Sequence, residues 1–207
     1  GEYTVAAQGK GDGSGTLSKQ ITVVNGLVGS GTKEDPYMIG SEYEWSCFAT
    51  LINDPDSNSI YSNKYYKLVN DITVSTMVGI SQETLFRGKF DGDNHTMTLN
   101  LNATEDYCAP FRYVIGGTFK RLHVAGTINT NGYRYAGGLI ACTKRDSYTT
   151  LIDNCWSSVT FNCTAAKDDN YDRCYGGFVG YAGKYVEISN CLFDGSFLGT
   201  DCKGCYL

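Results

Sequence analysis

The chain has 207 residues, a formal net charge of −5 and 42% hydrophobic residues, enough for one substantial core. The acidic balance argues against nucleic-acid binding, because contact with phosphates needs a basic surface. Only 19% of residues are charged, and with 25 Gly and 16 Tyr the composition is typical of a β-rich, turn-rich protein, not of a coiled coil or a disordered chain. No apolar run approaches the roughly 18 residues of a membrane span, so no transmembrane segment is expected.

Residues 1–30 predict an N-terminal linker and strand segment. A glycine-rich stretch at 9–15 precedes the β-forming residues 21–24, which either follow a preceding domain or pair onto the next elements. The chain begins at Gly1 without Met, so we expect an export signal to have been removed and the location to be extracellular or at the cell surface.

Residues 41–53 predict an amphipathic helix. Ser41 with Glu44 three residues later forms the pattern of a capping box. The apolar residues fall at helical spacing: Tyr43, Trp45, Phe48, Leu51 and Ile52. We expect this helix to cover the apolar end of the strands that follow at 66–74 and 86–101.

An imperfect repeat dominates the second half of the chain. Gly137-Gly138 recurs at Gly176-Gly177, an offset of 39 residues (176 − 137), and Asn154-Cys155 recurs at Asn190-Cys191, an offset of 36 (190 − 154). A weaker copy covers 110–128. Variable offsets between fixed apolar positions indicate short strands of constant length joined by loops of different length.

These repeats predict an all-β fold, a right-handed parallel β-helix (solenoid) with an N-terminal capping α-helix. The absence of helical periodicity excludes a two-helix repeat, and the scarcity of tight hairpin turns disfavours a propeller. Expected inward residues are Leu122, Val124, Ile128, Cys155, Ser157, Phe161, Cys191, Phe193 and Phe197. Asn154 and Asn190 are expected at the bend just before the inward cysteines, where asparagine accepts a tight-turn conformation. We divide the chain into 1–30, a capping helix with a first coil at 31–78, and repeat coils at 79–207, as one structural domain.

The order of these motifs resembles bacterial repeat proteins of the GLUG type. The resemblance rests on 31–39, the helix at 41–53, the segment 70–73 ending in Asn-Asp-Ile-Thr, the segment 90–97, and the Gly-Gly and Asn-Cys repeats, across roughly 31–207. Pro110-Phe111 and Cys142 depart from the glycines of that pattern. The resemblance implies a surface or secreted protein, often a module of a longer adhesin-like chain, without catalytic residues.

Metal and catalytic chemistry have weak signals. Asp168, Asp169 and Asp172 are candidate calcium ligands, but the loop lacks the Gly and Glu of a dedicated site, and a solvated loop is the favoured interpretation. The group Asp91, Asp93 and His95 is interpreted as a turn. The expected outward row His123, Trp156 and Leu192 carries no carboxylate pair, so an enzyme is not expected and no cofactor is predicted.

The nine cysteines follow the repeat more than they follow a metal or disulfide pattern. Cys202 and Cys205 form a C-x-x-C pair without a second pair to complete a zinc site. We expect Cys155 and Cys191 to be reduced, because stacking in register seldom gives the torsion of a disulfide. The loop cysteines, Cys163, Cys174, Cys202 and Cys205, are better candidates for any disulfide.

Exposed aromatic side chains give the clearest functional signal. Aromatic rings stack on sugars or anchor protein partners, although tyrosines are also frequent on ordinary strands. The candidate ligand-binding residues are Trp156, Tyr133, Tyr135, Tyr148 and Tyr171.

We therefore predict a non-catalytic bacterial surface or secreted module for adhesion, binding glycans or host and cell-surface glycoproteins. A stalk or spacer of a larger surface protein is the first alternative, and a carbohydrate-active enzyme is the second. The sequence stops where a further Gly-Gly strand is due, so we expect the last coil to have an open edge. Either more repeats continue the coil in a longer protein, or another chain covers the edge by self-association.

Overall fold

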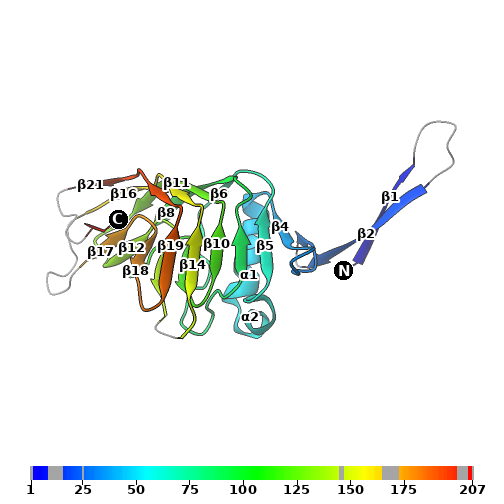
Figure 1. Ribbon diagram of the computed structural model, residues 1–207, viewed down its shortest axis with the longest axis horizontal. Helices are drawn as coiled ribbons and strands as arrows, with labels where there is room; N and C mark the ends of the chain where they lie inside the picture. The colour runs from blue at the N-terminus through cyan, green and yellow to red at the C-terminus, as the bar shows by residue number, and fades with distance from the viewer. Residues whose placement is uncertain are drawn as a thin grey trace.

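The computed structural model describes residues 2–8, 16–24, 26–144, 147–164, 173–199 and 205–206, with side chains from residue 26 to 199 within these ranges. Its first sheet has nine strands, and the pairs among β1 to β4 are antiparallel while every later pair is parallel. In spatial order its strands are β1 (Glu2–Gln8), β2 (Thr16–Val24), β3 (Leu27–Val28), β4 (Tyr37–Ile39), β5 (Tyr65–Leu68), β7 (Lys89–Asp91), β10 (Thr118–Lys120), β14 (Thr150–Asp153) and β19 (Val186–Ser189). Figure 1 shows β1 and β2 projecting from one end of the molecule.

The other sheets run beside the first and use the remaining strands of each repeat. A seven-stranded sheet contains β6 (Ile72–Val74), β8 (Thr96–Asn102), β11 (His123–Asn129), β15 (Trp156–Ser157), β16 (Thr160–Asn162), β20 (Leu192–Phe193) and β21 (Ser196–Leu198). One three-stranded sheet contains β9 (Phe111–Val114), β13 (Ile140–Thr143) and β18 (Val179–Tyr181). A second three-stranded sheet contains β12 (Tyr135–Gly137), β17 (Cys174–Gly176) and β22 (Cys205–Tyr206).

The prediction of an all-β right-handed parallel β-helix is wrong. The chain is mixed α/β: its sheets are mostly parallel, and two successive helices, α1 (Glu42–Asn53) and α2 (Pro55–Tyr61), lie between β4 and β5. The antiparallel strands β1 to β4 also depart from the predicted coils. The all-β prediction rested on a repeat that begins near residue 110. The repeat carries no information about residues 2–61, which contain the antiparallel strands and both helices.

Helix α1 begins where the capping pattern predicts. The Ser41 hydroxyl accepts a hydrogen bond from Glu44 N at 3.2 Å, and Glu44 Oε2 accepts one from Gly40 N at 2.7 Å, so two otherwise unpaired donors are satisfied. Its buried face carries Trp45, Phe48, Leu51 and Ile52, whereas Tyr43 is 70% exposed and does not belong to the apolar stripe.

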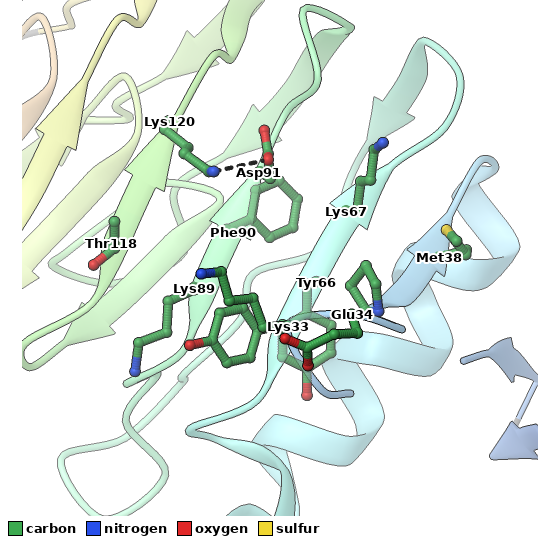
Figure 2. Close-up of a pocket in the computed structure, with 12 residues that line it drawn as sticks. Lys33, Glu34, Met38, Tyr66, Lys67, Lys89, Phe90, Asp91, Thr118 and Lys120 are labelled. Carbon is green, nitrogen blue, oxygen red and sulfur yellow. Dashed lines mark ion pairs between the residues drawn. The ribbon is translucent and has the colours of Figure 1, made fainter. Parts of the chain in front are cut away.

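Parallel pairing places equivalent residues of neighbouring strands beside one another on each face of the first sheet. The outward row runs from Met38 to Lys67, Asp91 and Lys120, as Figure 2 shows. The inward row runs from Tyr37 to Tyr66, Phe90, Phe119 and Ile152, all buried. Strand alternation therefore divides the sheet into a core face and a charged outer face.

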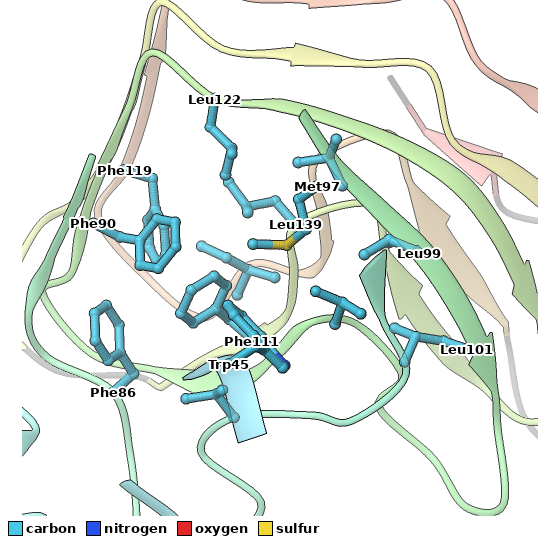
Figure 3. Close-up of a cluster of buried hydrophobic side chains, with 14 of the residues drawn as sticks. Trp45, Phe86, Phe90, Met97, Leu99, Leu101, Phe111, Phe119, Leu122 and Leu139 are labelled. Atoms are coloured by element: carbon cyan, nitrogen blue, oxygen red, sulfur yellow. The ribbon is translucent and has the colours of Figure 1, made fainter. Parts of the chain in front are cut away.

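The core packs side chains of α1 against buried side chains of the sheets (Figure 3). Phe111 is fully buried, and its ring centroid lies 4.7 Å from Phe119, 5.2 Å from Phe90 and 5.5 Å from Trp45. Trp45 also donates from Nε1 to the Thr76 carbonyl at 3.0 Å, which fixes the helix against the following segment.

Several predicted inward residues are confirmed as buried. Leu122, Val124, Ile128, Cys155, Ser157 and Phe161 are each at most 3% exposed. Phe193 in β20, Phe197 in β21 and Cys191 just before β20 are only partly buried against the core, because β20 and β21 end the described sheet. The asparagines expected at the bends adopt the left-handed backbone conformation, with φ of +52° at Asn154 and +53° at Asn190.

Candidate functional site

Two rows of side chains from successive repeats face each other across a cleft. Cys108 pairs with Ala136, and Ala136 pairs with Tyr175, which aligns the preceding residues Tyr107 and Tyr135. The second row is formed by Tyr113, Cys142 and Tyr181, which are paired in β9, β13 and β18.

The cleft consists of two adjoining cavities that share Tyr107 and Tyr113. The first, of about 380 Å³, is lined by Gln82, Tyr107, Tyr113, Tyr135, Cys142, Thr143, Lys144 and Tyr181. The second, of about 390 Å³, is lined by Glu105, Asp106, Tyr107, Arg112, Tyr113 and Tyr133. We call the two cavities together the tyrosine cleft.

Four rings form a continuous aromatic wall in this cleft. Tyr107 and Tyr135 are stacked, with centroids 4.8 Å apart and an interplanar angle of 14°. Tyr113 lies 5.3 Å from Tyr107, and Tyr181 meets Tyr135 edge-on at 5.4 Å. These are the spacings at which aromatic pairs attract, so the rings hold one another in place.

Two arginine–carboxylate pairs flank the rings. Arg112 Nη1 lies 2.6 Å from Glu105 Oε1, and Arg134 Nη2 lies 2.5 Å from Asp106 Oδ2. Asp106 also accepts from Arg134 N at 2.9 Å. Each guanidinium lies over a cleft tyrosine, since Arg112 is 5.3 Å from the Tyr113 centroid and Arg134 is 5.6 Å from that of Tyr135.

The phenol groups of Tyr107, Tyr113 and Tyr135 stay protonated at neutral pH. Burial, followed by neighbouring groups, raises the pKa of Tyr107 to about 12, and burial also raises the pKa of Tyr113 and Tyr135. Tyr107 has a φ of +70°, a conformation that costs free energy for a non-glycine residue and persists where surrounding contacts enforce it. The cleft therefore presents neutral hydroxyls, each able to donate and accept, on rigidly held rings.

The chemistry of the cleft favours binding over proton transfer. The hydrogen bond from Arg112 lowers the pKa of Glu105, so this carboxylate stays ionised at neutral pH and is a poor general acid. Burial raises the pKa of Cys142 to about 11, so its thiol is a poor nucleophile. No cluster of three or more metal-ligating side chains occurs among the described residues.

The structure brings together two of the predicted binding residues. Tyr133 and Tyr135 line the two adjoining cavities of the tyrosine cleft. Tyr148 is 64% exposed and lies outside both. Tyr171 and the candidate calcium ligands Asp168, Asp169 and Asp172 lie outside the described residues.

Trp156 lies on a different surface, the outer face of the seven-stranded sheet. Its ring stacks on His123 with centroids 3.8 Å apart, its Nε1 donates to Asp194 Oδ1 at 2.6 Å, and Leu192 occupies the neighbouring register position. One face of the Trp156 ring is thus covered by imidazole, and the side chain is 41% exposed.

Sequence reasoning missed most of the tyrosine cleft: Tyr107, Tyr113, Tyr181, Glu105, Asp106, Arg112 and Arg134. A signal existed in the alignment of the weak repeat with the next one, because Phe111 pairs with Ile140 and Tyr113 with Cys142. That alignment, an offset of 29 residues (140 − 111), would have placed Tyr107 opposite Ala136, one residue from its stacking partner Tyr135.

Cys155 and Cys191 are free thiols, and Cys155 N lies 3.4 Å from Cys191 Sγ. Of the cysteines considered as disulfide candidates, Cys163 is buried and Cys174 is half-buried, and the side chains of Cys202 and Cys205 lie outside the described residues. None of the described helices is long and apolar enough to cross a membrane.

Comparisons with family models, curated proteins and solved structures find no match to this chain. The similarity to GLUG-type repeats therefore stays a prediction from the order of the motifs.

Proposed function

We propose that this chain is a non-catalytic binding module, of the secreted or bacterial surface type, that holds a neutral saccharide in the tyrosine cleft. The observation that carries the proposal is the stacked pair Tyr107 and Tyr135 beside two oriented guanidinium groups. The C–H face of a pyranose packs on aromatic rings, while its hydroxyls need donors and acceptors held in fixed positions.

The rigidity of the cleft supports the same proposal. A ligand that binds preformed rings does not have to order them, so less of the interaction free energy is lost to conformational entropy. The ion pairs Arg112–Glu105 and Arg134–Asp106 fix the guanidinium groups beside the rings. The same sugar chemistry extends the proposal to glycoproteins at a cell surface.

The test is a titration of the protein by calorimetry with a panel of neutral hexasaccharides: cellohexaose, xylohexaose, mannohexaose and maltohexaose. We expect at least one to bind, and Tyr135→Ala to weaken that binding about 10-fold or more, the loss typical of a central aromatic anchor. Tyr148→Ala is the matched control, because it removes an exposed tyrosine outside the cleft.

Two outcomes would overturn the proposal. Absence of binding to the whole panel favours a spacer, and an equal loss from Tyr148→Ala places the ligand elsewhere. Tyr135→Leu, which keeps an apolar side chain, distinguishes lost stacking from lost folding when its thermal unfolding matches that of the unmodified protein.

Self-association forms a separate part of the proposal. Ile188 pairs in register with the fully buried Ile152, yet it is 48% exposed because β19 is the last described strand of its sheet. A second copy of the chain that covers this edge would bury Ile188 together with the exposed Leu192 and Leu198. Sedimentation equilibrium should then show a mass that rises with concentration and falls back to the monomer in Ile188→Lys; a constant monomer mass contradicts it.

A further inference from the structure

A second cavity lies on the outer face of the first sheet, away from the tyrosine cleft. It has a volume of about 500 Å³ and is crossed by β4, β5, β7 and β10 (Figure 2). Its lining consists of Lys33, Glu34, Pro36, Met38, Tyr65, Tyr66, Lys67, Lys89, Phe90, Asp91, Thr118 and Lys120. We call this cavity the lysine groove.

The groove carries charge of the opposite sign to the whole chain. Its lining contains four lysines and two carboxylates, Glu34 and Asp91, a balance of +2, whereas the chain as a whole carries −5. A concave surface lined by one excess sign concentrates the field and attracts ligands of the other sign.

One side of the groove is already neutralised within the protein. Lys120 Nζ lies 3.1 Å from Asp91 Oδ2, and Lys67 Nζ lies 2.8 Å from Asp93 Oδ2. Arg121 adds a further pair with Asp91 at 2.6 Å. This alternation of charges across neighbouring strands is a normal way to stabilise a sheet face, so these lysines need no ligand.

The other side of the groove holds ammonium groups without a carboxylate partner. Lys89 Nζ donates to the neutral Asn63 Oδ1 at 2.9 Å and lies 5.8 Å from the centroid of the Tyr65 ring. Lys33 forms no ion pair with the described part of the chain. Figure 2 shows Lys33 and Lys89 on the side away from the paired row of Lys67, Asp91 and Lys120.

Part of the apolar lining, Tyr65, lies beside Lys89. Tyr65 is the register neighbour of Lys89, and Pro36 and Met38 line the same cavity from β4 and the loop before it. A ligand that fits must therefore combine a flat apolar face with an anionic group.

We propose that the lysine groove binds an acidic saccharide, with the carboxylate or sulfate of one sugar held by Lys89 and Lys33 and its ring packed on Tyr65. Charge-assisted hydrogen bonds from ammonium groups are about twice as strong as neutral ones, and here they form without breaking an existing ion pair. Glu34 lines the same groove and opposes the anion. This site is independent of the tyrosine cleft and takes a different class of sugar.

The test uses calorimetric titration at about 50 mM salt with hexagalacturonate, a sulfated heparin hexasaccharide, cellohexaose and inorganic sulfate. We expect at least one of the acidic oligosaccharides to bind and to bind more weakly at about 300 mM salt, because exposed charges are screened. Free sulfate should bind far more weakly, since it has no apolar face to pack on Tyr65. The carboxylated and sulfated probes distinguish the two sources of the anion.

Variants of opposite effect locate the ligand. Lys89→Gln should weaken binding about five-fold or more, and Glu34→Gln should strengthen it. Lys184→Gln is the matched control, because Lys184 packs over Tyr185 outside the groove, and Tyr135→Ala should also leave acidic-saccharide binding unchanged.

The proposal is overturned by any of three results. These are no binding of either acidic probe, equal binding of cellohexaose at this site, or unchanged affinity in Lys89→Gln with unfolding like that of the unmodified protein. Failure here with intact neutral-sugar binding at the tyrosine cleft would leave the proposed function standing.

Discussion

Truncation of Phe111 to alanine should destabilise the protein strongly, because this side chain connects the helix to the sheets. The ring is fully buried and lies within 6.2 Å, centroid to centroid, of Trp45, Phe48, Phe86, Phe90 and Phe119. A buried Phe→Ala change typically costs about 3–5 kcal/mol through lost burial and the cavity that remains.

The surroundings of Phe111 place the expected loss in the upper half of that range, about 4–5 kcal/mol. Each aromatic pair adds roughly 0.5–1.5 kcal/mol beyond area burial, although these terms do not add fully within one cluster. The neighbouring rings are themselves held by the helix and by strands, so they cannot collapse easily into the cavity.

Equilibrium unfolding in urea, followed by tryptophan fluorescence, measures this loss. Phe111→Leu should cost clearly less than Phe111→Ala because it keeps part of the side-chain volume, and Ile60→Ala, at a side chain 58% exposed on α2, should change the free energy of unfolding by less than about 0.5 kcal/mol. A loss below about 2 kcal/mol for Phe111→Ala, with an unchanged urea dependence, would refute the packing described here.

Three further predictions concern a close backbone approach, a partly buried ion pair and a buried thiol. Gly138→Ala should lower the free energy of unfolding by about 1–3 kcal/mol in urea, because the new Cβ would lie 2.1 Å from the Gly177 carbonyl oxygen; an unchanged midpoint contradicts this close approach. Burial alone would raise the pKa of Asp91, but hydrogen bonding from Arg121 lowers this pKa below its ordinary value. The ionised Asp91 therefore stabilises the folded protein fully above the pKa of Asp91 in the unfolded chain. This stabilisation is lost as the pH falls through the pKa of Asp91 in the folded protein. Urea titrations from pH 7 to pH 2 should therefore show acid destabilisation that is shallower in Asp91→Asn; an equal slope contradicts the ion pairing. Burial raises the pKa of Cys155 to about 12, so its thiol should react with a disulfide reagent only after unfolding, and fast labelling of the folded protein would contradict its burial.

Local signals in the sequence predicted local structure well. Ser41 and Glu44 predicted the start of α1, and the asparagines before Cys155 and Cys191 predicted bends, whose backbone is left-handed in the structure. These features depend on hydrogen bonds and backbone sterics within a few residues, so a single sequence contains the whole cause.

Longer-range features were predicted less well. Helix α2 has its own signals, an Asp54 N-cap and Pro55 in the first turn, but it was not predicted, and together with the antiparallel β1 to β4 it makes the all-β assignment wrong. In the second half of the chain, the repeat predicted which face of most strands is buried. It did not predict the fold class of the whole chain.

The tyrosine cleft could not be found from residue types alone. Tyr107 and Tyr135 are adjacent because the strand segments that follow them pair in register. The register between successive repeats depends on loops of different length. Ile140 follows its partner Phe111 by 29 residues (140 − 111), whereas Val179 follows its partner Ile140 by 39 (179 − 140). The sequence thus drew attention to Tyr133 and Tyr135, which line the cleft, but not to the other residues that line it.

The most direct test of the proposed function is a crystal structure with the strongest-binding neutral hexasaccharide from the panel. We predict a sugar ring packed along Tyr107 and Tyr135, with hydroxyls within hydrogen-bonding distance of Arg112 or Arg134. A sugar bound instead at Trp156 or at the sheet edge, with the tyrosine cleft empty under conditions that saturate binding in solution, would contradict the assignment of the cleft as the binding site.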